Sequence, residues 1–212
     1  MKRVYLLSGV VSPFLYAFTV ILGGVLSDGY NHANQAISEL TAAGAPFRLT
    51  LNILFSISLL LAAYFAITSL QYIKQFKNRL LNISMWILLT ISVLSLLWAF
   101  FPMDLRGADT TIQGAIHLIL AGIVSPLTII CPMLVGLGFR KINRFKGYSI
   151  YCLATAAIIL VTGGIAALSA QNESAYMGVF ARLTIGSYQQ WLAITAMFFY
   201  LFLPERKRGW VK

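Results

Sequence analysis

Charged residues are scarce in this sequence, and acidic residues are the scarcest. Only six of the 212 residues are Asp or Glu, charged residues make up 10% of the chain, and 59% of it is hydrophobic. About a quarter of the residues in an ordinary soluble domain are charged, so this composition excludes a water-soluble globule. The chain is instead expected to be folded in lipid.

Cysteine and histidine are also rare, and the common catalytic signatures are missing. Cys131 and Cys152 lie inside apolar stretches, so neither fits a secreted disulfide framework or a metal-ligand spacing. The sequence has no HExxH and no GxSxG, which excludes the usual zinc-protease and serine-hydrolase motifs. We therefore predict no cofactor, and the weaker alternative is a zinc ion held by His32, His117 and a carboxylate.

Long uncharged stretches take up most of the chain. Six of them are 22 to 30 residues long, and roughly 20 residues suffice to cross the hydrocarbon core as a helix. No linker or charge-rich segment is long enough to form a soluble domain. The sequence predicts an all-α integral membrane protein, a single domain over residues 1–212. Its six-transmembrane-helix bundle is predicted over about residues 4–27, 49–73, 80–102, 111–139, 147–170 and 184–203.

The basic residues lie mostly on one side of this layout. Of the 16 Lys and Arg, 13 lie at the N-terminus, after the second and fourth helices, and in the C-terminal tail, whereas Arg48, Arg106 and Arg182 lie on the other side. Positively charged loops stay in the cytoplasm, so we expect a multi-pass plasma-membrane protein with both termini cytoplasmic. The basic loops then orient the chain and contact anionic lipids, and no nucleic-acid partner is expected.

Acidic residues and histidines show the opposite distribution. Ionisable groups near the hydrocarbon boundary are costly unless they are paired or hydrated. We therefore expect a polar site at the outer mouth of the bundle, with membrane lipids as its partners. The groups on this side are Asp28, His32, Glu39, Asp104, Asp109, His117 and Glu173.

Residues 27–48 form the longest outer segment. At helical spacing His32, Gln35 and Glu39 share one face. The segment predicts a short amphipathic helix that presents these side chains to the outer mouth. The alternative is a membrane-surface helix whose polar face is simply hydrated.

The second outer segment, residues 101–117, places a histidine inside a helix. With a helix start near Thr111, His117 lies about two turns in, ~9 Å along the axis, and Gln113 is one turn earlier on the same side. A histidine at that depth is expected to face a polar cavity. The alternative is a buried neutral imidazole that one neighbour satisfies.

Arg182 is the strong cation of the third outer segment. An ion pair with Glu39 or Asp104 is the expected arrangement, because a buried unpaired charge is costly. The alternative is bidentate binding of a phosphate or carboxylate from a ligand.

Several strings in the outer segments carry a family resemblance. They are Gly29-Tyr30-x-His32-x-x-Gln35-x-x-Ser38-Glu39-Leu40, Gly44-Ala45-Pro46-Phe47 with Asn52, and Phe101-Pro102-x-Asp104 with Gly114-x-x-His117; residues 178–183 fit more loosely. On these strings and the six-helix layout, the chain resembles the membrane family catalogued as domain of unknown function 998. The resemblance implies the fold and the importance of these outer residues, but it implies no activity.

Three functions are compatible with these residues. The first is binding, transport or sensing of a lipid or lipid-linked ligand in an outward-facing polar pocket. The second is a membrane-embedded enzyme acting on a lipid, with His117 or His32 as general base and Glu39 or Asp104 as acid or orienting group. The third is an accessory subunit whose polar cluster only locks the bundle. The ligand-binding candidates are Tyr30, Gln35, Ser38, Gln113 and Arg182.

Overall fold

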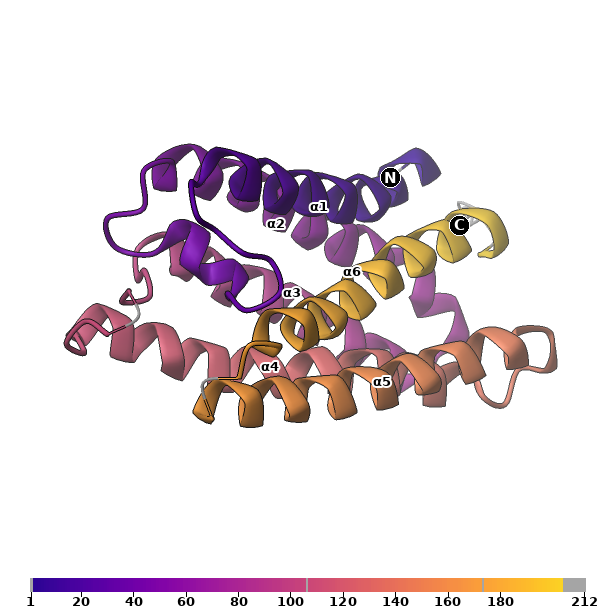
Figure 1. Ribbon diagram of the computed structural model, residues 1–212. Helices are drawn as coiled ribbons and strands as arrows, with labels where there is room; N and C mark the ends of the chain where they lie inside the picture. The colour runs from indigo at the N-terminus through magenta and orange to yellow at the C-terminus, as the bar shows by residue number, and fades with distance from the viewer. Residues whose placement is uncertain (1, 106, 173, 204–212) are drawn as a thin grey trace.

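The computed structural model describes residues 2–105, 107–172 and 174–203, and all regular structure within them is helical. Five short 3-10 helices adjoin or connect the long ones: η1 (Arg3–Leu7), η2 (Ile37–Thr41), η3 (Lys74–Phe76), η4 (Leu97–Ala99) and η5 (Asn143–Phe145). The six long helices are α1 (Ser8–Leu26), α2 (Arg48–Ile73), α3 (Arg79–Leu96), α4 (Ile112–Phe139), α5 (Lys146–Gln171) and α6 (Met177–Phe202) (Figure 1).

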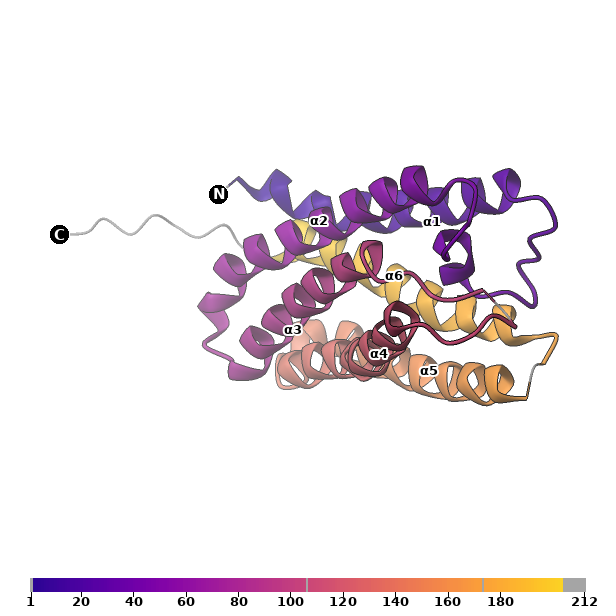
Figure 2. The same cartoon turned by 90° about the vertical axis from the view of Figure 1, so that its left-hand side faces the viewer.

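The long helices form a closed ring. Each packs against the next along the chain, and α1 packs against α6 to complete the circle. The start of α1 and the end of α6 lie at one end of the bundle, and the loop carrying η2 lies at the opposite end (Figures 1 and 2). We call that second end the polar face; it comprises residues 27–47, 97–105, 107–114 and the first turns of α6.

Within the described residues, five helices are long and apolar enough to cross a membrane. With their adjoining turns they span Arg3–Leu26, Arg48–Phe76, Arg79–Ala99, Ile112–Phe139 and Asn143–Gln171. Their outward surfaces expose large apolar side chains such as Val25 (76% exposed) and Ile112 (81%). Contiguous apolar surface of this kind is expected to contact lipid. A sixth crossing, by α6, stays a prediction from the sequence, as does the orientation of the bundle.

Aromatic side chains and interhelical hydrogen bonds hold the ring together. Phe65, Phe139 and Phe199 are fully buried in the core. Ser58 Oγ donates to the Ser12 carbonyl at 2.9 Å and so joins α2 to α1. Further hydrogen bonds join other helix pairs: Ser149 to the Gly136 carbonyl, Tyr148 to Thr195, Thr184 to Thr162, and Trp191 to the buried thiol of Cys152. The polar face therefore rests on a well-packed bundle.

Two predicted helix boundaries are displaced. Helix α3 and its 3-10 extension stop at Ala99 rather than at residue 102, because Pro102 lacks a backbone N–H and disfavours helical geometry in the residue before it. Helix α6 begins at Met177 rather than at residue 184. The predicted start was placed after Arg182 because of its charge. Arg182 nevertheless belongs to the helix, because its guanidinium donates hydrogen bonds to oxygen acceptors.

The predicted amphipathic helix in the first loop is wrong in form. The loop has a turn at residues 32–35 followed by the five-residue 3-10 helix η2. Asn31 and Gln35 cause this by bonding the local backbone: Asn31 Oδ1 accepts from Ala33 N at 2.8 Å, and Gln35 Oε1 accepts from Asn31 N at 2.7 Å. Side chains that bond the backbone in this way compete with helix formation. His32 and Glu39 consequently do not share a helical face.

Candidate ligand-binding site

Glu39 is the buried acid of the polar face, with a side chain only 9% exposed. Its Oε1 accepts from the backbone N–H of Ala36 at 2.8 Å, and its Oε2 accepts from Gln35 Nε2 at 2.9 Å. The first bond satisfies a free N–H at the start of η2, which is the usual role of an acid in a first helical turn. Glu39 therefore shapes the loop that carries it.

Arg182 joins α6 to the first loop. Its Nη1 donates to the carbonyl oxygens of His32, Gln35 and Gly178 at 2.5, 2.7 and 3.0 Å, and its Nη2 donates to the hydroxyl of Tyr30. The planar guanidinium suits several acceptors at once. Neither sequence alternative describes these bonds, because the acceptors are neutral oxygens of the chain itself.

A close backbone contact supports the same junction. A Cβ added to Gly178 would lie 2.6 Å from the carbonyl oxygens of His32 and Gln35, which no side chain tolerates. The next residue, Val179, donates its N–H to the Ala33 carbonyl at 2.9 Å. The first loop thus docks on α6 through its backbone.

Tyr30 and His32 lie beside this junction with perturbed pKa values. Burial raises the pKa of the Tyr30 hydroxyl, although nearby Arg182 opposes the shift. Partial burial and, secondarily, the Arg182 charge lower the pKa of His32, so the imidazole is neutral at pH 7. The His32 ring meets Tyr30 edge-on at 5.1 Å and lies against Gly24 of α1, where a Cβ would fall 2.1 Å from Nε2.

Asp104 organises the second segment by capping α4. Its two carboxylate oxygens accept from the backbone N–H and the hydroxyl of Thr111 at 2.9 and 2.8 Å. Thr111 Oγ1 in turn accepts from Gly114 N at 3.1 Å. Gly114 leaves room for the carboxylate, since a Cβ there would lie 1.9 Å from Asp104 Oδ2. This arrangement is an N-cap extended by an acid.

His117 is buried on α4, with 7% of its side chain exposed. Its Nδ1 lies 2.9 Å from the Phe101 carbonyl, and its ring centre is 5.7 Å from that of Trp98. A carbonyl oxygen only accepts, so Nδ1 carries the hydrogen. This environment is the buried imidazole with one polar neighbour that the sequence left as an alternative.

The predicted residues fall into two groups rather than one cluster. Tyr30, His32 and Arg182 lie at the junction with α6, whereas Asp104 and His117 lie at the top of α4. The first loop touches the second group through Met103, whose sulfur accepts from Ser38 Oγ and whose carbonyl accepts from Ala43 N. The Gln113 side chain is exposed and makes no hydrogen bond within the described residues.

Metal-ligand geometry is absent from the described part of the chain. No three His, Cys, Asp or Glu side chains gather there closely enough to hold an ion. Arg106 and Glu173, which the sequence assigns to the outer segments, lie outside the described residues.

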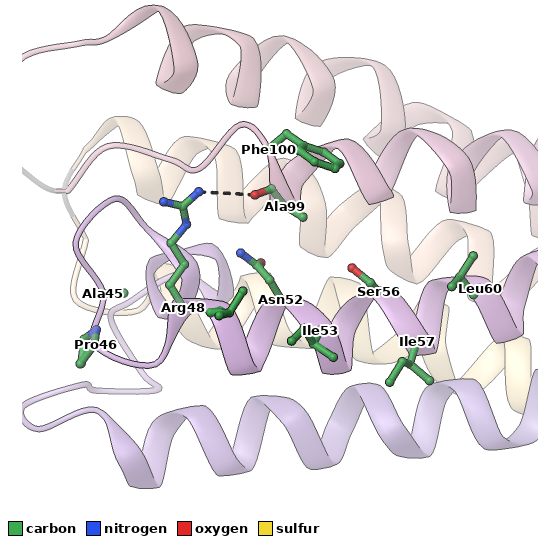
Figure 3. Close-up of a pocket in the computed structure, with 11 residues that line it drawn as sticks. Ala45, Pro46, Arg48, Asn52, Ile53, Ser56, Ile57, Leu60, Ala99 and Phe100 are labelled. Carbon is green, nitrogen blue, oxygen red and sulfur yellow. Dashed lines mark hydrogen bonds between the residues drawn. The ribbon is translucent and has the colours of Figure 1, made fainter.

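Two adjoining hollows open at the polar face. The smaller, which we call the polar pocket, has a volume of about 210 Å³ and is lined by Ser27, Asp28, Gly29, Tyr30, Gln35, Glu39, Gly44, Ala45, Pro46 and Leu105. The larger, which we call the α2–α3 groove, has a volume of about 650 Å³ and is lined by Ala45, Pro46, Arg48, Leu49, Asn52, Ile53, Ser56, Ile57, Leu60, Ala99 and Phe100 (Figure 3). Ala45 and Pro46 border both.

The groove contains a row of polar residues that sequence reasoning did not recognise as a row, although Asn52 belongs to the family strings. Arg48, Asn52 and Ser56 recur every four residues and so share one face of α2. That spacing was visible in the sequence. It was missed because Arg48 was counted only as a loop charge and Ser56 as part of an apolar helix.

The geometry can now be set beside known proteins. The family model described as protein of unknown function (DUF998) matches residues 10–197. The chain belongs to this family. No curated protein and no solved structure matches it.

The residues that carry the DUF998 resemblance therefore have physical roles in this chain. Gln35 and Glu39 fold the first loop, Asp104 caps α4 over Gly114, and His117 holds the Phe101 carbonyl. These residues of the family strings therefore form part of the framework of the polar face. Tyr30, Gln35 and Glu39 also line the polar pocket.

Proposed function

We propose that this DUF998 protein binds a membrane lipid or lipid-linked ligand at its polar face, as a binding, transport or sensing protein. The polar end of the ligand occupies the polar pocket, and its apolar chain follows the α2–α3 groove. One observation carries the proposal: the two hollows adjoin, since Ala45 and Pro46 line both. A small polar hollow beside an apolar-walled groove suits an amphiphile.

The sizes of the hollows support this division. Ligand pockets usually measure about 300–1,000 Å³. The groove, at about 650 Å³, is within that range, whereas the polar pocket, at about 210 Å³, is below it. The polar pocket alone therefore suits only a small group, such as part of a headgroup.

The lining of the polar pocket indicates which group it accepts. Its lining residues include two acids, Asp28 and Glu39, and the amide-bearing Gln35. Carboxylates accept hydrogen bonds and attract cations. A headgroup with hydroxyl or ammonium donors is the complementary ligand.

The enzyme alternative has weaker support. Acid–base catalysis requires the acid and base within hydrogen-bond reach of one reacting group. His117 and Asp104 each carry structural hydrogen bonds at the top of α4, whereas His32 and Glu39 belong to the first loop. The accessory-subunit alternative explains the hydrogen bonds but leaves the two hollows without a role.

Lipid retention tests the proposal. The full-length protein, extracted in mild detergent, is expected to keep a defined lipid class in native mass spectrometry. Glu39→Gln and Asp28→Asn should weaken retention, because they remove the acceptor charges of the polar pocket. Gln113→Ala, an exposed change outside both hollows, is the matched control. Wild-type protein that carries no lipid, and that no added lipid stabilises, would reject the proposal.

The proposal includes a plasma-membrane location with both termini in the cytoplasm. The basic bias of 13 among 16 Lys and Arg supports it. It also requires α6 to cross, as its 26-residue length allows. A reporter fused after Lys212 should be active only in the cytoplasm, and an external signal would reverse the assignment.

A further inference from the structure

Three polar side chains of α2 enter the α2–α3 groove one helical turn apart. Arg48 lies at the polar face, and Asn52 and Ser56 follow toward the middle of the helix (Figure 3). Polar residues on a membrane-facing helix are uncommon and usually mark a ligand or ion path. Their alignment in one groove needs an explanation.

These side chains have few partners within the chain. Among the described residues, the Arg48 guanidinium makes one long hydrogen bond, 3.4 Å from Nη2 to the Ala99 carbonyl. The Asn52 amide and the Ser56 hydroxyl make none with that part of the chain. Polar groups left unpaired in apolar surroundings carry a free-energy cost. A bound group that accepts their hydrogen bonds would remove that cost.

The charge of the groove is positive. Arg48 lines it, and its eleven lining residues include no carboxylate. Guanidinium groups bind phosphate through paired N–H donors, and amide and hydroxyl donors extend such a site. The complementary group is therefore a phosphate that carries net negative charge.

The remaining walls of the groove are apolar and exposed. Leu49 and Phe100 are 75% and 70% exposed, and Ile53, Ile57 and Leu60 continue the surface down the helix. From Arg48 to Leu60 the helix rises ~18 Å at 1.5 Å per residue. One half of the hydrocarbon core is ~15 Å thick. The groove thus has the depth of a single lipid leaflet.

We propose that the α2–α3 groove binds one anionic phospholipid, with its phosphate on Arg48 and Asn52 and an acyl chain along Ile53, Ile57 and Leu60. This inference rests on the proposed lipid-binding function and names the ligand class. The headgroup beyond the phosphate reaches the polar pocket past Ala45 and Pro46, which border both hollows.

The test uses the full chain in nanodiscs of mixed phosphatidylglycerol and phosphatidylcholine. After transfer to detergent, native mass spectrometry is expected to find one retained phosphatidylglycerol per wild-type chain. Arg48→Ala should reduce that retention about tenfold and Arg48→Lys by less, because lysine keeps the charge but loses the paired donors. Ile57→Trp fills the groove and should block retention with Arg48 intact. Lys74→Ala removes one charge from the exposed opposite end and should change nothing.

Each remaining outcome has a defined meaning. Unchanged phosphatidylglycerol retention in Arg48→Ala or in Ile57→Trp would overturn the inference. The inference would also be overturned if inorganic phosphate alone stabilised the protein as much as phosphatidylglycerol does, because that result would indicate a phosphate site without a lipid. Retention of neutral lipid that depends on Glu39 but not on Arg48 would overturn the inference and leave the proposed function standing. Thermal unfolding of every variant, followed by circular dichroism, separates lost binding from lost folding.

Discussion

Arg182 is the residue on which the order of the first loop depends most. Its Nη atoms donate to three backbone carbonyls and one hydroxyl, and three of these four acceptors lie about 150 positions away in the sequence. Hydrogen bonds from a charged group contribute about 1.5–3 kcal/mol each in favourable cases. The side chain is partly exposed, so the combined contribution is at the low end of that range.

Arg182→Ala is therefore expected to lower the free energy of unfolding by about 1.5–2 kcal/mol. Arg182→Lys should rescue only part of the loss, because one ammonium can replace Nη1 but leaves the Tyr30 hydroxyl without the donor that Nη2 supplies. Thermal unfolding in detergent measures the loss, and limited proteolysis should show new cleavage within residues 27–47. A lysine variant as stable as wild type would mean that charge alone matters at this position.

Gly114 and Asp104 act as one unit. A methyl group at residue 114 would occupy the position of the Asp104 carboxylate and so break its bonds to Thr111. Losing a helix cap costs about 1 kcal/mol. Gly114→Ala and Asp104→Ala should each destabilise by about that amount, and the double variant by little more than either alone. Additive losses in thermal unfolding would separate the two residues.

His32 gives the first loop a pH dependence with a definite sign. Its folded-state pKa is lowered by partial burial and by Arg182, so the unfolded chain binds the proton more readily. The loop is fully stable above the ordinary histidine pKa of about 6.5 and loses stability as pH falls below it. Hydrogen exchange within residues 27–47 should accelerate between pH 7.5 and 5.5, and His32→Gln should flatten that response. An equal response in the variant would assign the pH dependence elsewhere.

At the scale of elements, the contact of the first loop with α6 is the main feature of the polar face. The Gly178 backbone lies against the carbonyls of His32 and Gln35, and Val179 donates to Ala33. Gly178→Val is expected to detach the loop while leaving the helices formed. Faster hydrogen exchange limited to residues 27–47, with unchanged helical circular dichroism, is the expected result. Gly164→Ala, where a Cβ meets no atom within 4 Å, is the control.

Sequence reasoning predicted the helical elements better than the loop between the first two. Runs of uncharged residues mark where helices lie, because lipid requires every backbone group to be bonded internally. The form of the first loop depends on Asn31 and Gln35 turning back on their own backbone, and on acceptors for Arg182 that lie far away in sequence. Helical spacing alone predicted a shared face for His32 and Glu39, and the turn at residues 32–35 removes it.

Only part of the candidate site was predictable from the sequence. Tyr30, Gln35 and Glu39 line one hollow, and their roles in binding or catalysis stay predictions. The α2–α3 groove was not predicted, because it depends on where Ala99 and Phe100 lie relative to α2. The packing of the helices decides that position.

At the scale of the whole molecule, the bundle is asymmetric. One end holds the start of α1 and the end of α6, and the other holds the first loop (Figures 1 and 2). The N-cap of α4 and the openings of both hollows belong to this second end. The framework hydrogen bonds of the polar face account for its shape. The hollows that this shape leaves open account for the proposed binding of an amphiphile.

Native mass spectrometry of the full-length chain, extracted from its own membrane in mild detergent, tests lipid binding most directly. The wild-type spectrum is expected to show a population shifted by the mass of one lipid. That population should fall in Ile57→Trp, which fills the groove, and persist in Gln113→Ala. A wild-type chain that carries no lipid, and whose unfolding temperature no added lipid raises, would contradict the account.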